Sequence, residues 1–333
     1  WYLQKAVSAD TSTVSNVSVR NTIFSFNAHK GIYAEKLTEA VFEDCTIDNN
    51  GSDDTVLPVY FNDWKAGVDL NLKAGAYANI SFINCAITNN GTGQAKEGVG
   101  IAIKARNDAT SYNTFAASLD NVQIIGGTVT GNERGIRIGE PNKVNDAINN
   151  VIIHGVQVYG NLKVHTGPDG SPYGDVINLS PNAVDATGNW WGQAVGPTMD
   201  QVVGTVASCG WLDAAPPTGV AVPKPVLNSR TGLGHCTIQA AIDDPLTLNG
   251  DTITVAAGTY VEELRINKSV TLLGPNADIN PNTGDRVEEA VIKSSVDGAV
   301  ITQVTGVSIK GFTFDGQGTS DSAIYAYDGA GSV

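Results

Sequence analysis

Short runs of alternating apolar and polar residues, each closed by Asn or Gly, recur along this chain. They are NVSVRNTIFSFN (16–27), AVFEDCTIDNNG (40–51), ISFINCAITNNG (80–91), VQIIGGTVTGN (122–132), VIIHGVQVYGN (151–161) and VSIKGFTFDGQG (307–318). A period of two predicts β-strands with one face turned inward. The residues expected on that face are Ile23, Ile47, Ile87, Val129, Val158 and Phe314. Asn and Gly tolerate a positive φ, so each run is predicted to be strand, corner, strand.

A second kind of strand follows many of these runs and begins with Gly-Ile or Gly-Val. Its copies are GIYAE (31–35), GVDLNL (67–72), GVGIAIKAR (98–106) and GIRIGE (135–140). Equivalent corners are unevenly spaced, with 40 residues from Cys45 to Cys85 and 42 from Cys85 to Gly127. Loops of unequal length do not suit hairpins closed by two-residue turns. They suit parallel coils stacked about 4.8 Å apart, so we predict an all-β fold, a right-handed parallel β-helix solenoid.

Composition supports one elongated solenoid over two average domains. Gly is 37 of 333 residues, and charged residues are only 16%, which fits short strands joined by tight polar corners. The net charge of −14 disfavours nucleic acid and anionic membrane surfaces as partners. The chain contains no run of about 18 apolar residues, so we predict no membrane-spanning segment. Because the chain opens with Trp1 and shows no signal-peptide pattern, we expect a processed chain or an excised unit.

The second half of the chain contains what looks like the beginning of a known fold. TIQAAIDD (237–244), GDTITVAAGTY (250–260) and VEELRINKSVTLLGP (261–275) resemble the N-terminal cap and first coils of the pectin-lyase-like β-helix superfamily, particularly its secreted and cell-surface members. In that cap Thr237 is expected to begin a short helix. One face of the helix, with Ile238, Ala241 and Ile242, would cover the apolar mouth of the first coil.

The matching end of the fold comes earlier in the chain. ATGNWWGQAVGP (186–197), followed by Trp211 and Leu212, resembles the last coil of those surface proteins. Trp190 and Trp191 could offer sugar rings a stacking platform, or could pack into that terminal coil. The resemblance covers nearly all of the chain and identifies a superfamily rather than an activity.

The reversed order predicts three parts. Residues 1–212 would be the closing part of a β-helix, 213–225 a linker rich in Pro and Ala, and 226–333 an opening part that carries the cap. Stacked as 226–333 followed by 1–212, the coils would extend about 50 to 60 Å, whereas the linker reaches at most about 43 Å. Self-closure would therefore be strained, and we expect each part to complete the β-helix of another copy, head to tail.

Candidate chemistry is sparse. Enzymes of this superfamily usually act on polyanionic sugars along an outward strand face, where Asp69, Lys104 and Arg137 could stack as a substrate-binding strip. A lyase or epimerase needs a base and a cation there, and a hydrolase needs two carboxylates about 5 to 9.5 Å apart. The other interpretation, which we prefer, is a solvated face with ion pairs between coils. We assign no catalytic residue.

Two further sets of side chains leave alternatives open. DNNGSDD (48–54) gathers Asp48, Asp53 and Asp54, which offer the oxygen ligands that calcium prefers, or form a hydrated turn. No other metal or cofactor is expected. Cys45 and Cys85 occupy equivalent repeat positions, and Cys209 and Cys236 flank the linker. Each pair could be a disulfide or two buried thiols.

These observations predict a non-enzymatic extracellular protein. It would be a structural repeat or subunit of a β-helical cell-surface fibre, sheath or adhesin, with other copies of itself as partners. A carbohydrate-active enzyme, such as a polysaccharide lyase, an epimerase or a pectinesterase-like protein, is the first alternative. A polysaccharide-binding surface module is the second.

Overall fold

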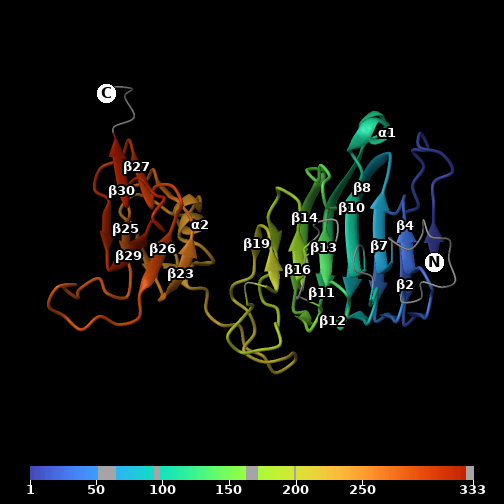
Figure 1. The fold of residues 1–333 in the computed structure, drawn as a ribbon, viewed down its shortest axis with the longest axis horizontal. Coiled ribbons are helices and arrows are strands. Elements are labelled where there is room, and N and C mark those ends of the chain that lie inside the picture. The colour runs from blue at the N-terminus through green and yellow to red at the C-terminus, as the bar shows by residue number, and fades with distance from the viewer. Residues whose placement is uncertain (52–64, 94–97, 163–171, 199, 328–333) are drawn as a thin grey trace. The chain divides into compact units, whose positions relative to one another are not determined.

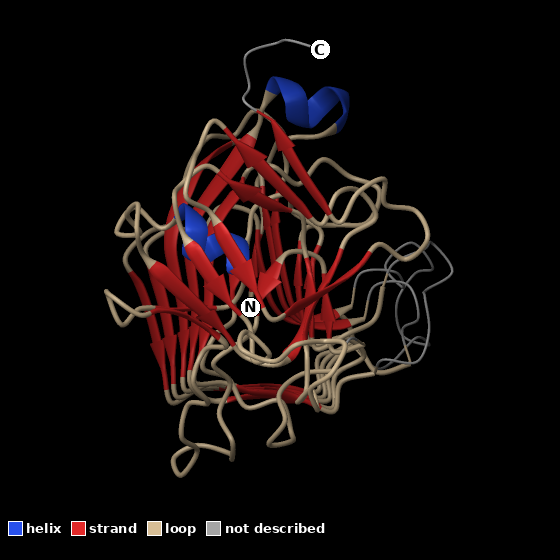
Figure 2. Ribbon diagram, turned by 90° about the vertical axis from the view of Figure 1, so that its left-hand side faces the viewer, coloured by secondary structure: helices blue, strands red, loops and turns tan. Residues whose placement is uncertain are grey.

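The computed structural model describes residues 1–51, 65–93, 98–162, 172–198 and 200–327. The chain divides into two compact units, Trp1–Val222 and Pro223–Val333. Figure 1 labels many of their elements, and Figure 2 shows that strands rather than helices make up most of the regular structure. Within the described residues the helices are α1 (Ala109–Thr114) and α2 (Ile238–Asp243). The all-β prediction is confirmed.

The described strands of the first unit form three parallel sheets. The first sheet consists of β1 (Tyr2–Leu3), β4 (Lys30–Ala34), β7 (Ala66–Leu72), β10 (Val99–Ala105), β13 (Ile136–Ile138), β16 (Val176–Asn178) and β18 (Val202–Val203). The second consists of β2 (Val17–Arg20), β5 (Ala40–Glu43), β8 (Gly75–Ile83), β11 (Ala117–Ile125), β14 (Ile148–His154), β17 (Val184–Asp185) and β19 (Val206–Ala207). The third consists of β3 (Ile23–Ser25), β6 (Thr46–Asp48), β9 (Ala86–Thr88), β12 (Thr128–Thr130) and β15 (Gln157–Tyr159).

The chain visits these sheets in rotation. From β1 to β15 it passes through the first, second and third sheet in turn, five times, so one passage forms one coil. Every strand pairs in parallel with its counterpart in the next coil, and in Figure 1 the coils follow one another from β4 to β19. These stacked parallel sheets are consistent with a β-helix.

Equivalent apolar residues lie on top of one another inside the coils. In the third sheet Ile47 pairs with Ile87, Ile87 with Val129, and Val129 with Val158, and all four are buried as predicted. The prediction for Ile23 is wrong, because its side chain is 72% exposed and Phe24 takes the inward place beside Ile47. NTIFSFN holds two adjacent apolar residues, so alternation alone does not decide which of the two, Ile23 or Phe24, points inward from β3.

Asn and Gly hold the corners between strands. Between the second and third sheets the corner residues are Asn21, Asp44, Asn84, Gly126 and Gly155, all with a positive φ. Each lies in the left-handed region, where Gly carries no Cβ penalty and Asn tolerates the strain. The left-handed corners predicted from the repeats are therefore confirmed.

The described strands of the second unit also form three sheets. The first of them consists of β21 (Gly234–His235), β20 (Val226–Asn228), β22 (Thr252–Val255), β25 (Thr271–Leu273) and β28 (Ser308–Lys310). The others consist of β23 (Gly258–Val261), β26 (Ala290–Lys293) and β29 (Phe312–Asp315), and of β24 (Leu264–Ile266), β27 (Ala299–Thr302) and β30 (Ile324–Tyr327). Strand β20 pairs antiparallel with β21 and β22, and the remaining pairs are parallel.

Helix α2 caps the core of the second unit as predicted. The Thr237 side chain accepts a hydrogen bond from the Ala240 amide at 3.1 Å, which satisfies one of the free N–H groups at the start of the helix. Three residues of α2 are buried in the core of this unit, namely Ile238, Ala241 and Ile242.

Residues 211–222 fold back on themselves in the first unit. Leu212 forms an antiparallel bridge with Ala221, and the Val222 amide donates to the carbonyl of Trp211 at 2.7 Å. The expected linker 213–225 is therefore, over 213–222, a folded turn rather than an extended tether. The length of a Pro-containing segment says nothing about the hydrogen bonds it makes to residues before it.

Candidate functional site: a buried polar strip on the first sheet

The three residues predicted to form a strip lie on neighbouring strands of the first sheet. Asp69 is on β7 and pairs with Ala102, which in turn pairs with Arg137 on β13. Lys104 on β10 lies two residues further along and pairs with Asn71. The strands therefore align Asp69 with Arg137, and the long side chain of Lys104 reaches back to Asp69.

The strip is not a solvated face. Asp69, Lys104 and Arg137 are at most 2% exposed, so the expectation of an open, water-covered strip is wrong. The expected ion pairs between coils are nevertheless present. Alternation along a strand fixes which side chains point away from the core, but it does not determine whether they remain in contact with water.

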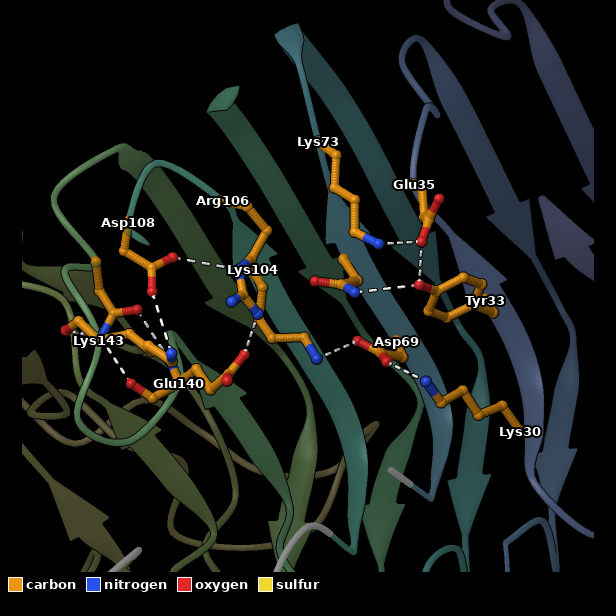
Figure 3. A network of polar contacts seen from close by, with 12 residues as sticks. Lys30, Tyr33, Glu35, Asp69, Lys73, Lys104, Arg106, Asp108, Glu140 and Lys143 are labelled. Atoms are coloured by element: carbon orange, nitrogen blue, oxygen red, sulfur yellow. Dashed lines mark hydrogen bonds and ion pairs between the residues drawn. The ribbon is translucent and has the colours of Figure 1, made fainter. Parts of the chain in front are cut away.

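Asp69 lies between two lysines, as Figure 3 shows. One carboxylate oxygen is 2.6 Å from Nζ of Lys30 on β4, and the other is 2.9 Å from Nζ of Lys104. Burial acts to raise the pKa of Asp69, but the charges of Lys104 and Lys30 outweigh it and hold that pKa below its ordinary value. A carboxylate held in its ionised form in this way is a poor general base.

A second cluster adjoins this trio at the same edge of the strip. The Tyr33 hydroxyl donates to the Glu35 carboxylate, which also pairs with Lys73, and it accepts from Nδ2 of Asn71 at 3.1 Å. Burial, followed by the hydrogen bond to Glu35, raises the pKa of the Tyr33 hydroxyl. Tyr33 therefore stays protonated, and it also lies close to the Lys30 ammonium, which is 4.2 Å from its ring centroid.

A third cluster continues the strip along β10 and the segment after β13. Arg106 contacts Asp108 at 3.3 Å and Glu140 at 2.5 Å, and Lys143 is 3.4 Å from Asp108 (Figure 3). Oppositely charged side chains thus pair between neighbouring coils from β4 to the segment after β13. Networks of this kind hold neighbouring strands in one register.

The described side chains of the strip are closely packed around Asp69. The space between Asp69, Lys104, Arg137 and the neighbouring Lys65 is too small for a water molecule. Within the described residues no group of three His, Cys, Asp or Glu side chains could hold a metal ion. Of the calcium candidates, Asp48 lies on β6 and its carboxylate accepts from Asn49 at 2.7 Å, while Asp53 and Asp54 lie outside the described residues.

The four cysteines differ in their bonding state, and Trp191 is buried. Cys45 and Cys85 are buried free thiols, whereas Cys209 and Cys236 are disulfide-bonded. Burial raises the pKa of the Cys85 thiol to about 11. Trp191 is buried in the core of the first unit, so it is not available as a sugar platform.

A ladder of five asparagines, four of them buried, runs along the coils and was not among the sequence predictions. We call Asn27, Asn50, Asn90, Asn132 and Asn161 the asparagine ladder. Each follows the left-handed corner after a third-sheet strand, where Asn or Gly was interpreted only as a turn residue. The signal was present in the sequence, since an Asn stands at the same place in the first five runs and Gln317 stands there in the sixth.

The side-chain amides of the asparagine ladder all donate in the same direction along the coils. Nδ2 of Asn50 donates to Oδ1 of Asn90 at 3.0 Å, and Asn90 donates to Asn132 at 2.9 Å. The last member, Asn161, donates to the buried carboxylate of Asp175 at 2.8 Å. Each Oδ1 also accepts the backbone amide of the preceding member, as Asn132 does from Asn90 at 2.9 Å. Buried amides in this ladder are therefore well satisfied.

A groove with polar walls lies on the outer side of the second sheet. Its lining includes Asn79, Asp120, Asn121 and Asn150, which are mostly exposed. Nδ2 of Asn121 donates to Asn79, and Nδ2 of Asn150 donates to Asp120, both at 2.6 Å. Hydroxyl-rich ligands are recognised by such rows of amide and carboxylate groups.

Comparison with known proteins gives a partial match. A protein named cell surface glycoprotein, from Methanothermus fervidus, is 34% identical to this chain over 99 residues. The match covers 30% of this chain and 15% of that protein. No family model and no solved structure matches the chain. Within the described residues, no helix has the length and apolar character needed to cross a bilayer.

Proposed function

We propose that this chain is a structural module of a cell-surface fibre, sheath or adhesin, which assembles by stacking its coils on those of another copy. In this proposal both units belong to right-handed parallel β-helices of the pectin-lyase-like kind. The similarity to a protein named cell surface glycoprotein supports the extracellular location.

The observation that carries the assembly proposal is the state of the terminal coils. Strands β2 and β3 lie at the ends of their sheets in the first unit, and β28, β29 and β30 at the ends of theirs in the second. Their inward residues are only partly covered. In the same row of one sheet, Leu264 and Ala299 are fully buried but Ile324 is 44% exposed. Sheet ends with exposed apolar residues are templates for further pairing.

The buried strip supports a structural role over an enzymatic one. Asp69 already pairs with Lys30 and Lys104. The space among Asp69, Lys104 and Arg137 is too small for a water molecule. An enzyme of this class needs an accessible base and cation at that face. The strip would instead hold the coils in register.

The test is the assembly state of the purified chain. We expect size-exclusion chromatography with light scattering to show species that grow with protein concentration, and negative-stain microscopy to show filaments. A monomer at every concentration, with no filaments, would contradict the proposal.

Polysaccharide binding is a second candidate, favoured by the polar groove over β8, β11 and β14. Co-sedimentation with insoluble polysaccharides, compared between the native chain and the Asn121→Ala and Asp120→Ala variants, would test it. Retention that both variants share with the native chain would exclude this groove.

A further inference from the structure

The end strands of the two units have closely similar sequences. VSIKGFTFD (307–315), which contains β28 and β29, aligns without a gap on VSVRNTIFS (17–25), which contains β2 and β3. Val307, Ile309 and Phe314 then correspond to Val17, Val19 and Phe24, all packed against the core of their own unit. The outward Ser308 corresponds to Ser18. One end thus has the same strand pattern as the other.

The similarity extends to the next strand along each chain segment, β30 after β29 and β4 after β3. Ile324-Tyr325-Ala326 in β30 matches Ile32-Tyr33-Ala34 in β4. The orientation matches too. Ile324 and Ala326 pair with Ala299 and Ile301, in rows that point into the core of the second unit.

Strand β4, unlike β2 and β3, already has a partner on its outer side. That partner is β1, a strand of two residues, in which Tyr2 pairs with Tyr33 and Leu3 with Ala34. The rings of Tyr2 and Tyr33 are stacked, with centroids 4.4 Å apart. Trp1-Tyr2-Leu3 thus repeats the order apolar, Tyr, apolar that β30 also has.

From these correspondences we infer that a second copy docks its second unit onto the first unit of this chain by strand exchange. In this arrangement β28 pairs with β2, β29 with β3, and β30 displaces β1 from β4. Tyr325 of the arriving copy stacks on Tyr33 in place of Tyr2. This inference rests on the proposed assembly and adds its register and the strand that must leave.

Strand β30 can pair with β4 only if β1 is displaced, because both would occupy the same place in the first sheet. One coil contributes one strand to each sheet, and parallel strands lie about 4.8 Å apart. If β28 and β29 paired directly with β2 and β3 while β30 stacked outside β1, one sheet would contain an extra strand and the coils would no longer be level. Strand β1 has only two residues, Tyr2 and Leu3. Its displacement breaks the hydrogen bonds that the Tyr33 and Glu35 amides donate to the carbonyls of Trp1 and Leu3, and β30 would supply carbonyls in their place.

The alternation of apolar and polar residues at this interface suits one register. Lys310 would lie beside Arg20, but Arg20 is already paired with Glu43 at 3.1 Å. A shift of one residue would turn Ile309 and Phe314 outward and bury the polar Ser308 and Thr313. The alternation on both ends therefore favours the aligned pairing.

Cross-linking between separately prepared variants tests the register. A Ser308→Cys protein is mixed with a Ser18→Cys protein under mild oxidation, so that a mixed disulfide can form only between copies. Directly opposed residues of parallel strands lie within disulfide reach. We expect a mixed dimer that joins the two variants, and none from the matched control, Ser308→Cys with Arg20→Cys.

The results separate the register from the assembly. Filaments with cross-linking in the Arg20→Cys mixture, or in neither mixture, would overturn the register and leave the proposed assembly standing. Absence of both filaments and cross-links would overturn the assembly itself. A doubly substituted Ser18→Cys, Ser308→Cys chain that cross-links only within one molecule would also overturn docking between copies.

Variants that weaken the pairing of β1 with β4 test whether β30 replaces β1. Tyr2→Gly removes the ring that stacks on Tyr33 and lowers strand propensity, whereas Tyr2→Phe keeps the ring. We expect Tyr2→Gly to assemble at a severalfold lower protein concentration than Tyr2→Phe. An equal or higher threshold concentration for Tyr2→Gly would show that β1 stays in place and would overturn the exchange.

Discussion

The Asp69 carboxylate lies 2.6 Å from the ammonium of Lys30 on the neighbouring strand, and both side chains are only 3% exposed. The opposite oxygen of the same carboxylate meets Lys104. One negative charge is thus shared between two cations that come from the preceding and following coils. This arrangement makes Asp69 the central group of the buried strip.

Replacing Asp69 with Asn should destabilise the first unit strongly. Two buried ammonium groups would lose their common counter-charge, and breaking a buried ion pair typically costs about 3 to 5 kcal/mol. Denaturant unfolding of Asp69→Asn measures the loss. The control is Glu43→Gln, which breaks the more exposed pair with Arg20 and should cost less than about 1 kcal/mol. Similar losses in the two variants would contradict the central role of Asp69.

The same group predicts how stability changes with pH. The pKa of Asp69 in the folded protein lies below its ordinary value of 3.8. Its stabilising contribution is therefore complete above that value and is lost as the pH falls toward the folded-state pKa. The gap in unfolding free energy between the native chain and Asp69→Asn should narrow as the pH is lowered below 3.8. A gap independent of pH in that range would refute the assignment.

The asparagine ladder predicts a second stability effect. Asn90→Ala would leave the backbone amide and Nδ2 of Asn50 without their Oδ1 acceptor, and the carbonyl of Ile47 without its Nδ2 donor. Leaving buried groups unsatisfied costs about 1 to 3 kcal/mol each. Asn113→Ala, at an exposed position of α1, should change stability by about 0.5 kcal/mol or less. The midpoint of thermal unfolding for each variant decides between them.

Thiol chemistry gives a further test. Burial raises the pKa of Cys85 to about 11, and the thiolate is the reactive form, so a thiol reagent at about pH 8 should react slowly with the native chain. After unfolding without reductant, two thiols should react, Cys45 and Cys85. Rapid reaction of the native protein, or four reactive thiols after unfolding, would be inconsistent with the structure.

The cap of the second unit can be tested separately. Thr237→Ala removes the side-chain oxygen that accepts from the Ala240 amide, and the loss should be about 1 kcal/mol. Thr237→Ser keeps that oxygen and should retain most of the stability. If both variants lost the same amount, the hydrogen bond would not be the source of the stabilisation.

Local patterns predicted much of this fold because the fold is built from local repeats. Thr237, Ile238, Ala241 and Ile242 form the predicted cap, since helix capping and the spacing of one apolar face depend only on neighbouring residues. Ile47 and Ile87 were placed correctly for the same reason. Ile23 was not, because two adjacent apolar residues satisfy the same alternation in two registers.

The candidate site was less predictable. The sequence showed that Asp69, Lys104 and Arg137 project from the outer side of a sheet, but exposure depends on residues from elsewhere in the chain. The asparagine ladder was overlooked for another reason. Its members follow turn residues, and their amide contacts join residues that are 23 to 42 positions apart in sequence, which no local pattern reports.

Every member of the asparagine ladder donates its amide in the same sense along the coils, toward Asp175. An additional coil carrying Asn at this position could therefore be inserted by gene duplication without reversing any existing donor or acceptor. The unequal intervals between members show that the connecting loops can differ in length while the amide contacts persist. Such a chain can lengthen or shorten by whole coils during evolution, and its loops can diversify independently of its interior.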